Sequence, residues 1–124
     1  DMPLTSRHWL AADAHCRALP GSTQDIKWEE HWVWSVGEKM YAIFDREPQR
    51  NDRLTLPVDP ERFLEWTEQP GIIPAPYLAR HKWVQVTAEA RLTQAQLNQM
   101  LSDAHARIVA KLPARLRRDI EVSA

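Results

Sequence analysis

The sequence predicts a small α+β domain built from an antiparallel sheet and helices, and three observations support this class. Two strand-forming runs meet at Gly37-Glu38. Apolar residues recur at helical spacing after Thr5 and again after Thr93. Other short stretches alternate between apolar and polar residues, as half-buried strands do. With 124 residues, the chain can bury one core but not two ordinary ones, so we expect a single domain over residues 1–124.

Composition and charge narrow the classes of function. Hydrophobic residues make up 44% of the chain and charged residues 27%, and the formal net charge is −1. Such a chain has no general attraction for nucleic acid or anionic lipid, so binding to either would require a local basic patch. Cys16 is the only cysteine, which excludes an internal disulfide and favours the reducing cytoplasm. No apolar run reaches membrane-spanning length, so we expect no membrane segment. We also expect a cytoplasmic protein and a monomer.

The first predicted element is a helix that begins at Thr5, whose hydroxyl suits a helix N-cap. Pro20-Gly21 ends the helix. Its apolar side chains recur at helical spacing and are Trp9, Ala12, Cys16 and Leu19. Residues 23–28 then alternate with a period of two and predict the first strand.

The next predicted element is a β-hairpin over residues 32–44. A two-residue loop that opens with Gly37 suits a type II′ turn, because glycine accepts a positive φ. Pairing Val36 with Lys39 sets Trp34 across from Tyr41 and Trp32 across from Ile43 on one face. The other face would then carry Val33, Met40, Ala42 and Phe44.

A charged loop over residues 45–53 separates this hairpin from a fourth strand at residues 54–58. Asp59-Pro60 predicts the start of a second helix, because aspartate caps free N–H groups and proline at the first helical position loses no hydrogen bond. Its apolar side chains are Phe63, Leu64 and Trp66. Pro70-Gly71 ends this helix, and we expect the proline-rich segment up to Arg80 to run irregularly.

The last third of the chain predicts a strand and two helices. Residues 82–87 alternate as the fifth strand. Thr93 and Gln96 form a capping box at the start of a long helix that ends at Pro113. The apolar residues of this helix are Leu97, Leu101, Ala104, Ile108 and Leu112. Residues 113–120 predict a short basic helix with its arginines toward solvent.

An ordered set of short motifs covers nearly the whole chain. It consists of Pro20-Gly21, residues 36–42, Asp59-Pro60-Glu61, Pro70-Gly71, residues 74–78, Trp83-Val84, Lys111-Leu112-Pro113 and Leu116-Arg117. This set resembles the MmcQ/YjbR family. The resemblance implies a CyaY-like (frataxin-type) fold, which is a two-layer α+β sandwich of an antiparallel sheet of about five strands with helices packed on one face. It also implies a small bacterial cytoplasmic protein of a family that is labelled DNA-binding.

The chain departs from the family pattern at two places. Thr55-Leu56-Pro57 stands where the family often has Ser-Leu-Lys, so a commonly basic position is lost. Ala104-His105 stands where a Ser-Tyr pair usually lies on the long helix. Asp13 is the only carboxylate inside the first helix, so the acidic ridge of frataxins is missing and iron binding does not carry over with the fold.

The aromatic residues of the hairpin suggest one candidate site. If the helices cover the face that carries Met40 and Phe44, then Trp32, Trp34 and Tyr41 face the open side of the sheet. Their rings could then stack on bases or on a flat ligand. The alternative is that these rings pack in the core, because large rings bury much apolar area.

Basic residues suggest a second candidate site. They form three clusters, which comprise Arg46, Arg50 and Arg53, then Arg80 and Lys82 beside His81, and then Lys111, Arg115, Arg117 and Arg118 with Arg107 nearby. If the fold brings two clusters to one side, they could neutralise phosphates. Acidic residues are interleaved with these clusters, so an ordinary solvated charged surface is the alternative.

No catalytic or metal-binding pattern is evident. None of the five histidines has a ligand spacing, and His15 and Cys16 are adjacent, so on a helix they point about 100° apart. With three glycines the chain has no glycine-rich phosphate loop. We therefore expect no cofactor, no metal and no enzymatic activity. The sequence favours weak, sequence-independent DNA binding. The alternative is a protein-binding or small-ligand module that uses the aromatic sheet face and the proline-rich loop at residues 74–77.

Overall fold

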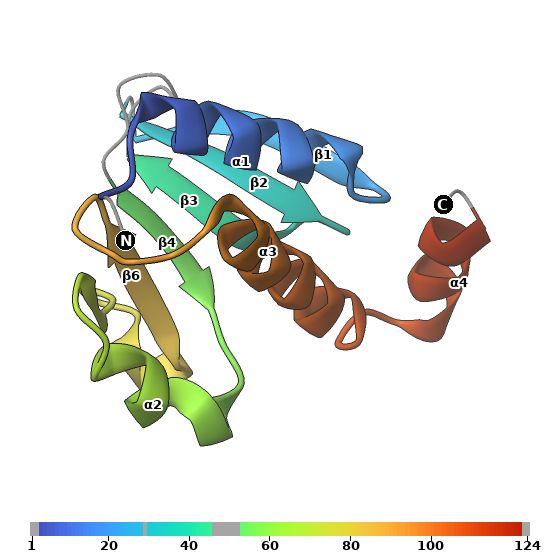
Figure 1. Cartoon of the computed structure of the whole chain (residues 1–124). Helices are drawn as coiled ribbons and strands as arrows, with labels where there is room; N and C mark the ends of the chain where they lie inside the picture. The colour runs from blue at the N-terminus through green and yellow to red at the C-terminus, as the bar shows by residue number, and fades with distance from the viewer. Residues whose placement is uncertain (1–2, 29, 46–52, 123–124) are drawn as a thin grey trace.

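The computed structural model describes residues 3–28, 30–45 and 53–122, and shows one sheet with helices on one face (Figure 1). The helices are α1 (Ser6–Ala18), α2 (Phe63–Thr67), α3 (Gln94–Val109) and α4 (Ala114–Val122). The strands are β1 (Ser22–Lys27), β2 (His31–Val36), β3 (Lys39–Asp45), β4 (Arg53–Pro57), β5 (Ile72–Pro74) and β6 (Trp83–Thr87). Short 3₁₀ helices are η2 (Pro60–Arg62) and η3 (Ala79–His81). The predicted two-layer α+β architecture is confirmed.

The sheet has six strands in the order β1-β2-β3-β4-β6-β5, and each neighbouring pair is antiparallel. The additional strand, β5, lies in the segment that we expected to be irregular. Pro74 is compatible with pairing because β5 is an edge strand, where one side of the backbone needs no partner. The two edges of the sheet are therefore β1 and β5.

The hairpin between β2 and β3 is present, but its turn differs from the prediction. Val36 pairs with Lys39 as expected. Gly37 has φ +56° and Glu38 has φ +65°, so both central residues are left-handed. Two positive φ angles indicate a type I′ turn, whereas the predicted type II′ turn has only one. The II′ prediction is therefore wrong.

A β-bulge changes the register of this hairpin beyond its first two pairs. Ser35 pairs with Met40, but Trp34 then pairs with Ala42, and Trp32 pairs with Phe44. Tyr41 is thus the extra residue of β3. Because a bulge places an extra residue on one strand, the alternation of faces is interrupted. The predicted pairs Trp34–Tyr41 and Trp32–Ile43 are therefore wrong, and Tyr41, Ala42 and Phe44 all join the same core as Trp34.

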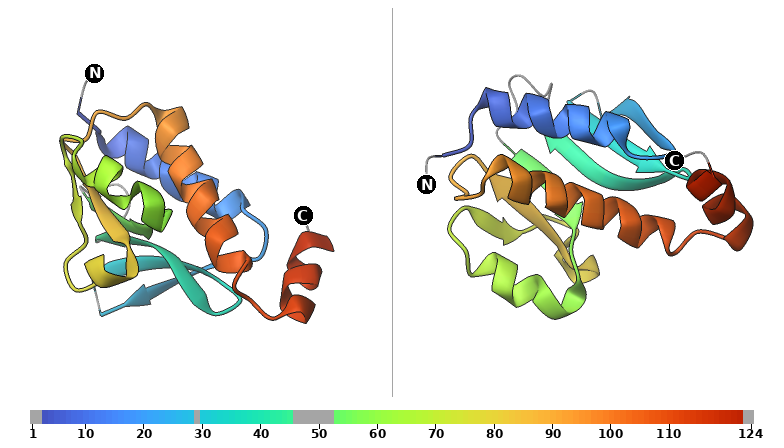
Figure 2. Two further views of the ribbon diagram at one scale, coloured as in Figure 1. Left: turned by 90° about the horizontal axis from the view of Figure 1, so that it is seen from below. Right: turned by 45° about the vertical axis from the view of Figure 1, so that its right-hand side comes forward.

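The hydrophobic core lies between the sheet and the layer formed by α1 and α3, which lie side by side (Figures 1 and 2). Its largest fully buried side chains include Trp9, Trp34, Tyr41, Phe44, Leu97 and Leu101. His15 Nε2 lies 2.7 Å from Ser102 Oγ and links the two helices. The predicted capping box of α3 is confirmed, because Thr93 N–H donates to Gln96 Oε1 at 2.8 Å and Gln96 N–H donates to Thr93 Oγ1 at 3.1 Å.

Helix α4 stands apart from the two layers (Figure 2). None of its residues is buried, although Ile120 is half-buried against the core. The link from α3 is fixed at Leu112, which is buried and lies close to Gly37 at the hairpin turn. Helix α4 therefore exposes nearly all of its side chains.

Candidate functional site

The aromatic platform predicted on the open face is not formed. Trp34 is 2% exposed and Tyr41 is 0% exposed, and both lie under the helices. Trp32 is half-buried and packs against the same core. The helices cover the face that carries the indole of Trp34, and the bulge at Tyr41 keeps the phenol on that face. The alternative that these rings pack in the core is the one the structure shows.

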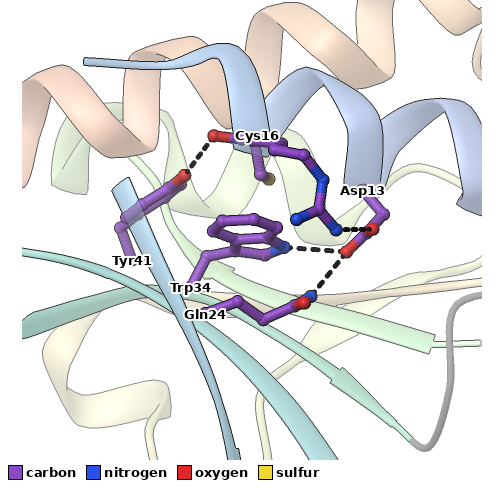
Figure 3. Close-up of polar contacts among 6 residues, drawn as sticks. Asp13, Cys16, Gln24, Trp34 and Tyr41 are labelled. Atoms are coloured by element: carbon purple, nitrogen blue, oxygen red, sulfur yellow. Dashed lines mark hydrogen bonds and ion pairs between the residues drawn. The ribbon is translucent and has the colours of Figure 1, made fainter. Parts of the chain in front are cut away.

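Trp34 belongs to a polar cluster beneath α1 (Figure 3). The carboxylate of Asp13 is buried, and its Oδ1 accepts hydrogen bonds from Trp34 Nε1 at 2.9 Å and Gln24 Nε2 at 2.8 Å. Arg17 donates to Asp13 Oδ2 at 3.3 Å, and its guanidinium lies 5.2 Å from the centre of the Trp34 ring. Each oxygen of the carboxylate has a partner, so this cluster fastens α1 to β1 and β2.

The only thiol lies beside this cluster and is buried. Burial raises the pKa of the Cys16 thiol to about 12, so it remains protonated at neutral pH. Burial also raises the pKa of the Tyr41 phenol. The Tyr41 hydroxyl donates to the Cys16 carbonyl at 3.3 Å and accepts from Ser22 Oγ at 2.8 Å. Neither group has the lowered pKa of an activated nucleophile.

His105 occupies a structural position. Its Nε2 donates to the Pro20 carbonyl at 2.7 Å, and its ring packs edge-on against Tyr41 with ring centres 5.2 Å apart. Burial lowers the pKa of this imidazole, which keeps it neutral. Across the part of the chain that the structure describes, no group of three or more His, Cys, Asp or Glu side chains is arranged to hold a metal ion.

Of the first two basic clusters, the structure describes Arg53, Arg80 and Lys82, and each of these side chains contacts a neighbouring protein group. Arg46 and Arg50 lie outside the described residues. Arg53 begins β4 and donates to Gln85 Oε1 on the neighbouring strand at 3.4 Å. Arg80 belongs to η3 and donates to His81 Nε2 at 3.2 Å, while Lys82 lies with its ammonium 5.0 Å from the centre of the Phe63 ring.

The third cluster runs from the end of α3 into α4. We call it the α3–α4 basic surface, and it comprises Arg107, Lys111, Arg115, Arg117 and Arg118. Lys111, Arg115 and Arg118 are exposed, and Arg117 donates to the Ala110 carbonyl at 3.5 Å. Among residues 3–28, 30–45 and 53–122, no ion pair forms with Lys111, Arg115 or Arg118.

This surface continues into a groove of about 500 Å³ between α3 and the η2–α2 segment. Arg107 and Lys111 line the groove from α3, and Arg62 lines it from the opposite side. Arg107 lies 3.9 Å from Asp59 Oδ2, and the guanidinium of Arg62 lies 5.0 Å from the ring centre of Trp66. Sequence reasoning missed Arg62, because only the packing of the η2–α2 segment opposite α3 brings it near Lys111.

The alternative prediction was a protein-binding or small-ligand module that uses the aromatic sheet face and the proline-rich loop. Of these two parts, the loop is open to solvent. Tyr77 is 98% exposed, and Ile73 and Leu64 are also exposed. Tyr77 has φ +67°, in the left-handed region that favours glycine. The Tyr77 ring therefore lies in solvent at a turn whose backbone is left-handed.

A search for membrane-crossing segments among the described residues finds no helix with the length and apolar character that crossing requires.

Comparisons with known proteins agree with the fold. A solved structure of a Deinococcus radiodurans protein with a DUF419 domain is 27% identical, with a TM-score of 0.74, and the match covers 87% of this chain and 83% of that one. A Pseudomonas syringae protein is 18% identical, with a TM-score of 0.61 over 76% of this chain and 92% of its own, and shows the fold alone. No curated protein matches the sequence. The family model described as YjbR matches residues 17–107, which is most of the chain, so the chain belongs to the YjbR family.

Proposed function

We propose that this chain binds duplex DNA weakly, without sequence preference, through the α3–α4 basic surface. The observation that carries the proposal is the placement of α4, which has no buried residue and stands off the domain with Arg115 and Arg118 exposed (Figure 2). A duplex could therefore approach these guanidinium groups without any change in the core. Guanidinium groups suit phosphate because they form paired hydrogen bonds to its oxygens.

The charge pattern argues for backbone contacts rather than base readout. The basic residues fall between Arg107 and Arg118, whereas Asp119 and Glu121 lie in the last part of α4. With a formal net charge of −1, the attraction is local, so the affinity depends on a few phosphate contacts. Phosphate contacts carry no sequence information by themselves. Weak and nonspecific binding is the behaviour that this arrangement supports.

The proposed role is binding without catalysis. The Cys16 thiol is protonated, and the imidazole of His105 is neutral and bonded to a backbone carbonyl. Neither residue lines the groove beside the α3–α4 basic surface. The groove carries Asp59 and Asp103 as well as basic side chains, and Arg62 pairs with Glu65 at 3.2 Å. The proposed phosphate contacts therefore rest on the exposed guanidinium groups of α4.

Fluorescence anisotropy with a labelled duplex of about 20 base pairs would test the proposal. We expect binding at low salt whose affinity falls steeply as salt rises, because neutralising phosphates releases counterions. The Arg115→Gln/Arg118→Gln variant should bind at least tenfold more weakly. For this variant, the slope of log affinity against log salt concentration should be smaller in magnitude by about one for each lost phosphate contact.

The matched control is Arg7→Gln/Arg80→Gln, which removes the same two charges from α1 and η3, away from α4. This variant should bind as the unmodified protein does. Absence of binding at tens of micromolar protein in low salt would reject the proposal. Equal weakening by both variants would show that net charge, rather than the α3–α4 basic surface, determines the affinity.

A second candidate function is protein binding through the proline-rich loop, favoured by the 98% exposure of Tyr77. Exposed aromatic and apolar residues that cluster on a surface often mark interfaces. A Tyr77→Ser variant separates the two functions, because it should leave DNA affinity unchanged while weakening a protein contact at this loop. This candidate becomes the better one if the charge variants have no effect on DNA binding.

A further inference from the structure

The free edge of β1 combines an open backbone with exposed apolar side chains. β1 lies at one end of the sheet, and among the residues that the structure describes it pairs only with β2. Ile26 is 54% exposed and Trp28, just after the strand, is 64% exposed. A regular edge strand with exposed apolar residues is a template for pairing with another strand.

The first half of α1 presents a further exposed apolar residue, Leu10. Helix α1 runs antiparallel to β1, and Asp13 is bonded to Gln24 at 2.8 Å. Leu10 lies about one turn before Asp13, and Ile26 lies two residues after Gln24, so both lie toward the same end of the edge. Leu10 is 47% exposed. Leu10 and Ile26 are therefore two exposed apolar residues toward the same end of α1 and β1.

The backbone direction at Ile26 is also fixed by a contact. The Ile26 N–H donates to the side-chain Oδ1 of Asp25 at 2.8 Å, from which we infer that this N–H points toward the open edge. In an antiparallel strand the N–H and C=O of one residue point to the same side. Ile26 can therefore exchange both hydrogen bonds with an identical residue of another β1 strand. Asp25 occupies that donor only while the edge is unpaired.

We propose that two copies of this chain pair antiparallel through β1, with the two-fold axis at Ile26. In this register Asp25 of each copy faces Lys27 of the other, which gives two opposite-charge pairs. A shift by two residues in one direction would set Asp25 against Asp25, and a shift in the other direction would set Lys27 against Lys27. The charges therefore favour one register among those that preserve the backbone pattern.

A two-fold contact of this kind closes on itself and produces a dimer rather than a fibre. It would join two six-stranded sheets and cover Ile26 of both copies. The other edge is less suitable, because β5 has three residues and ends at Pro74. This dimer differs from the monomer that we expected from the sequence.

Sedimentation equilibrium between about 1 µM and 1 mM of the full chain would test the proposal, with the charge reversals Asp25→Lys and Lys27→Asp. Each single reversal turns two attractive pairs into two repulsive ones, so the dimer Kd should rise at least tenfold. The double variant restores opposite charges and should return the Kd to within about threefold of the original. Glu89→Lys, at an exposed loop position, is the matched control and should leave the Kd unchanged.

A cross-link provides a second measurement that does not depend on charge. The α-carbons of an Ile26–Ile26 pair would lie about 5.5 Å apart, which is within the range that a disulfide bridges. Ile26→Cys should therefore form a covalent dimer on mild oxidation, while Arg7→Cys should not. A monomer at every concentration, or a dimer whose Kd is unaffected by the reversals, would overturn the proposal. So would reversals whose effect the double variant fails to restore.

Discussion

At the scale of single residues, Asp13 shows how a polar group becomes part of a core. Its carboxylate is buried between α1 and the sheet, and three side chains donate to it (Figure 3). A buried indole N–H needs an acceptor, because leaving it without one costs the full desolvation of that group. Asp13 supplies this acceptor for Trp34, which explains why a carboxylate is tolerated among apolar residues.

Asp13→Ala should lower the free energy of unfolding by about 1–3 kcal/mol, because the Trp34 N–H would remain buried without an acceptor. Urea titration followed by circular dichroism would measure the loss. In a Trp34→Phe background, which has no N–H, the same substitution should cost clearly less. An equal loss in both backgrounds would mean that the hydrogen bond to Trp34 does not account for the effect.

The role of Asp13 was only partly accessible from the sequence. The sequence identifies it as the only carboxylate inside the first helix. Its partner could not be predicted, because the strand pattern of residues 32–44 is apolar on both faces. Such a pattern does not indicate which face the helices cover. For this reason the sequence left open whether Trp34 and Tyr41 form a platform on the open face or pack in the core.

At the scale of elements, the backbone at Glu89 and Ala90, just after β6, passes so close to Gly71 that no residue with a side chain fits at position 71. Gly71 has φ +77°, and a Cβ atom there would lie 2.2 Å from the backbone nitrogen of Ala90. The Gly71 carbonyl accepts from the N–H and the hydroxyl of Thr87, each at 2.8 Å. Backbone on both sides of the contact leaves no flexible group that can move aside.

Gly71→Ala should therefore destabilise the protein by about 3 kcal/mol or more, from left-handed strain together with the backbone clash. The comparison is Gly37→Ala, where a Cβ atom would meet the Leu112 side chain at 2.7 Å. Because a leucine side chain can adjust, we expect a loss of about 1–2 kcal/mol there. Thermal unfolding of both variants would check the order, and a larger loss at Gly37 would contradict it.

Most elements could be predicted from local signals, and the exceptions have physical causes. The capping box at Thr93 and the start signal at Asp59 are local, and both are present: Asp59 Oδ1 accepts from the Glu61 N–H at 2.9 Å. The bulge at Tyr41 arises from pairing between strands and leaves no mark in the alternation. Strand β5 was missed because Pro74 and the prolines on either side of the strand indicate a loop, although an edge strand accepts a proline.

At the scale of the whole molecule, the candidate site depends on how elements distant in sequence are placed. The α3–α4 basic surface is a contiguous run and could be predicted from the sequence. The groove could not, since it requires the η2–α2 segment to pack opposite α3. Whether the basic clusters share one side of the molecule likewise cannot be derived from the sequence.

Deleting residues 114–124 should leave the domain folded and abolish the proposed DNA binding. Helix α4 has no buried residue, and Ile120 is its main contact with the core, so we expect the unfolding free energy to fall by less than about 2 kcal/mol. Thermal unfolding and anisotropy on the shortened chain would measure the two effects. A chain that no longer folds would show that α4 contributes more to the core than its exposure indicates.

The enclosed position of Cys16 makes this protein convenient for site-specific spectroscopy. With its sulfur buried and its pKa raised to about 12, the native cysteine should resist maleimide reagents under folded conditions. A probe attached to a cysteine engineered on α4 would then report from a single location, with no need to replace the natural one first.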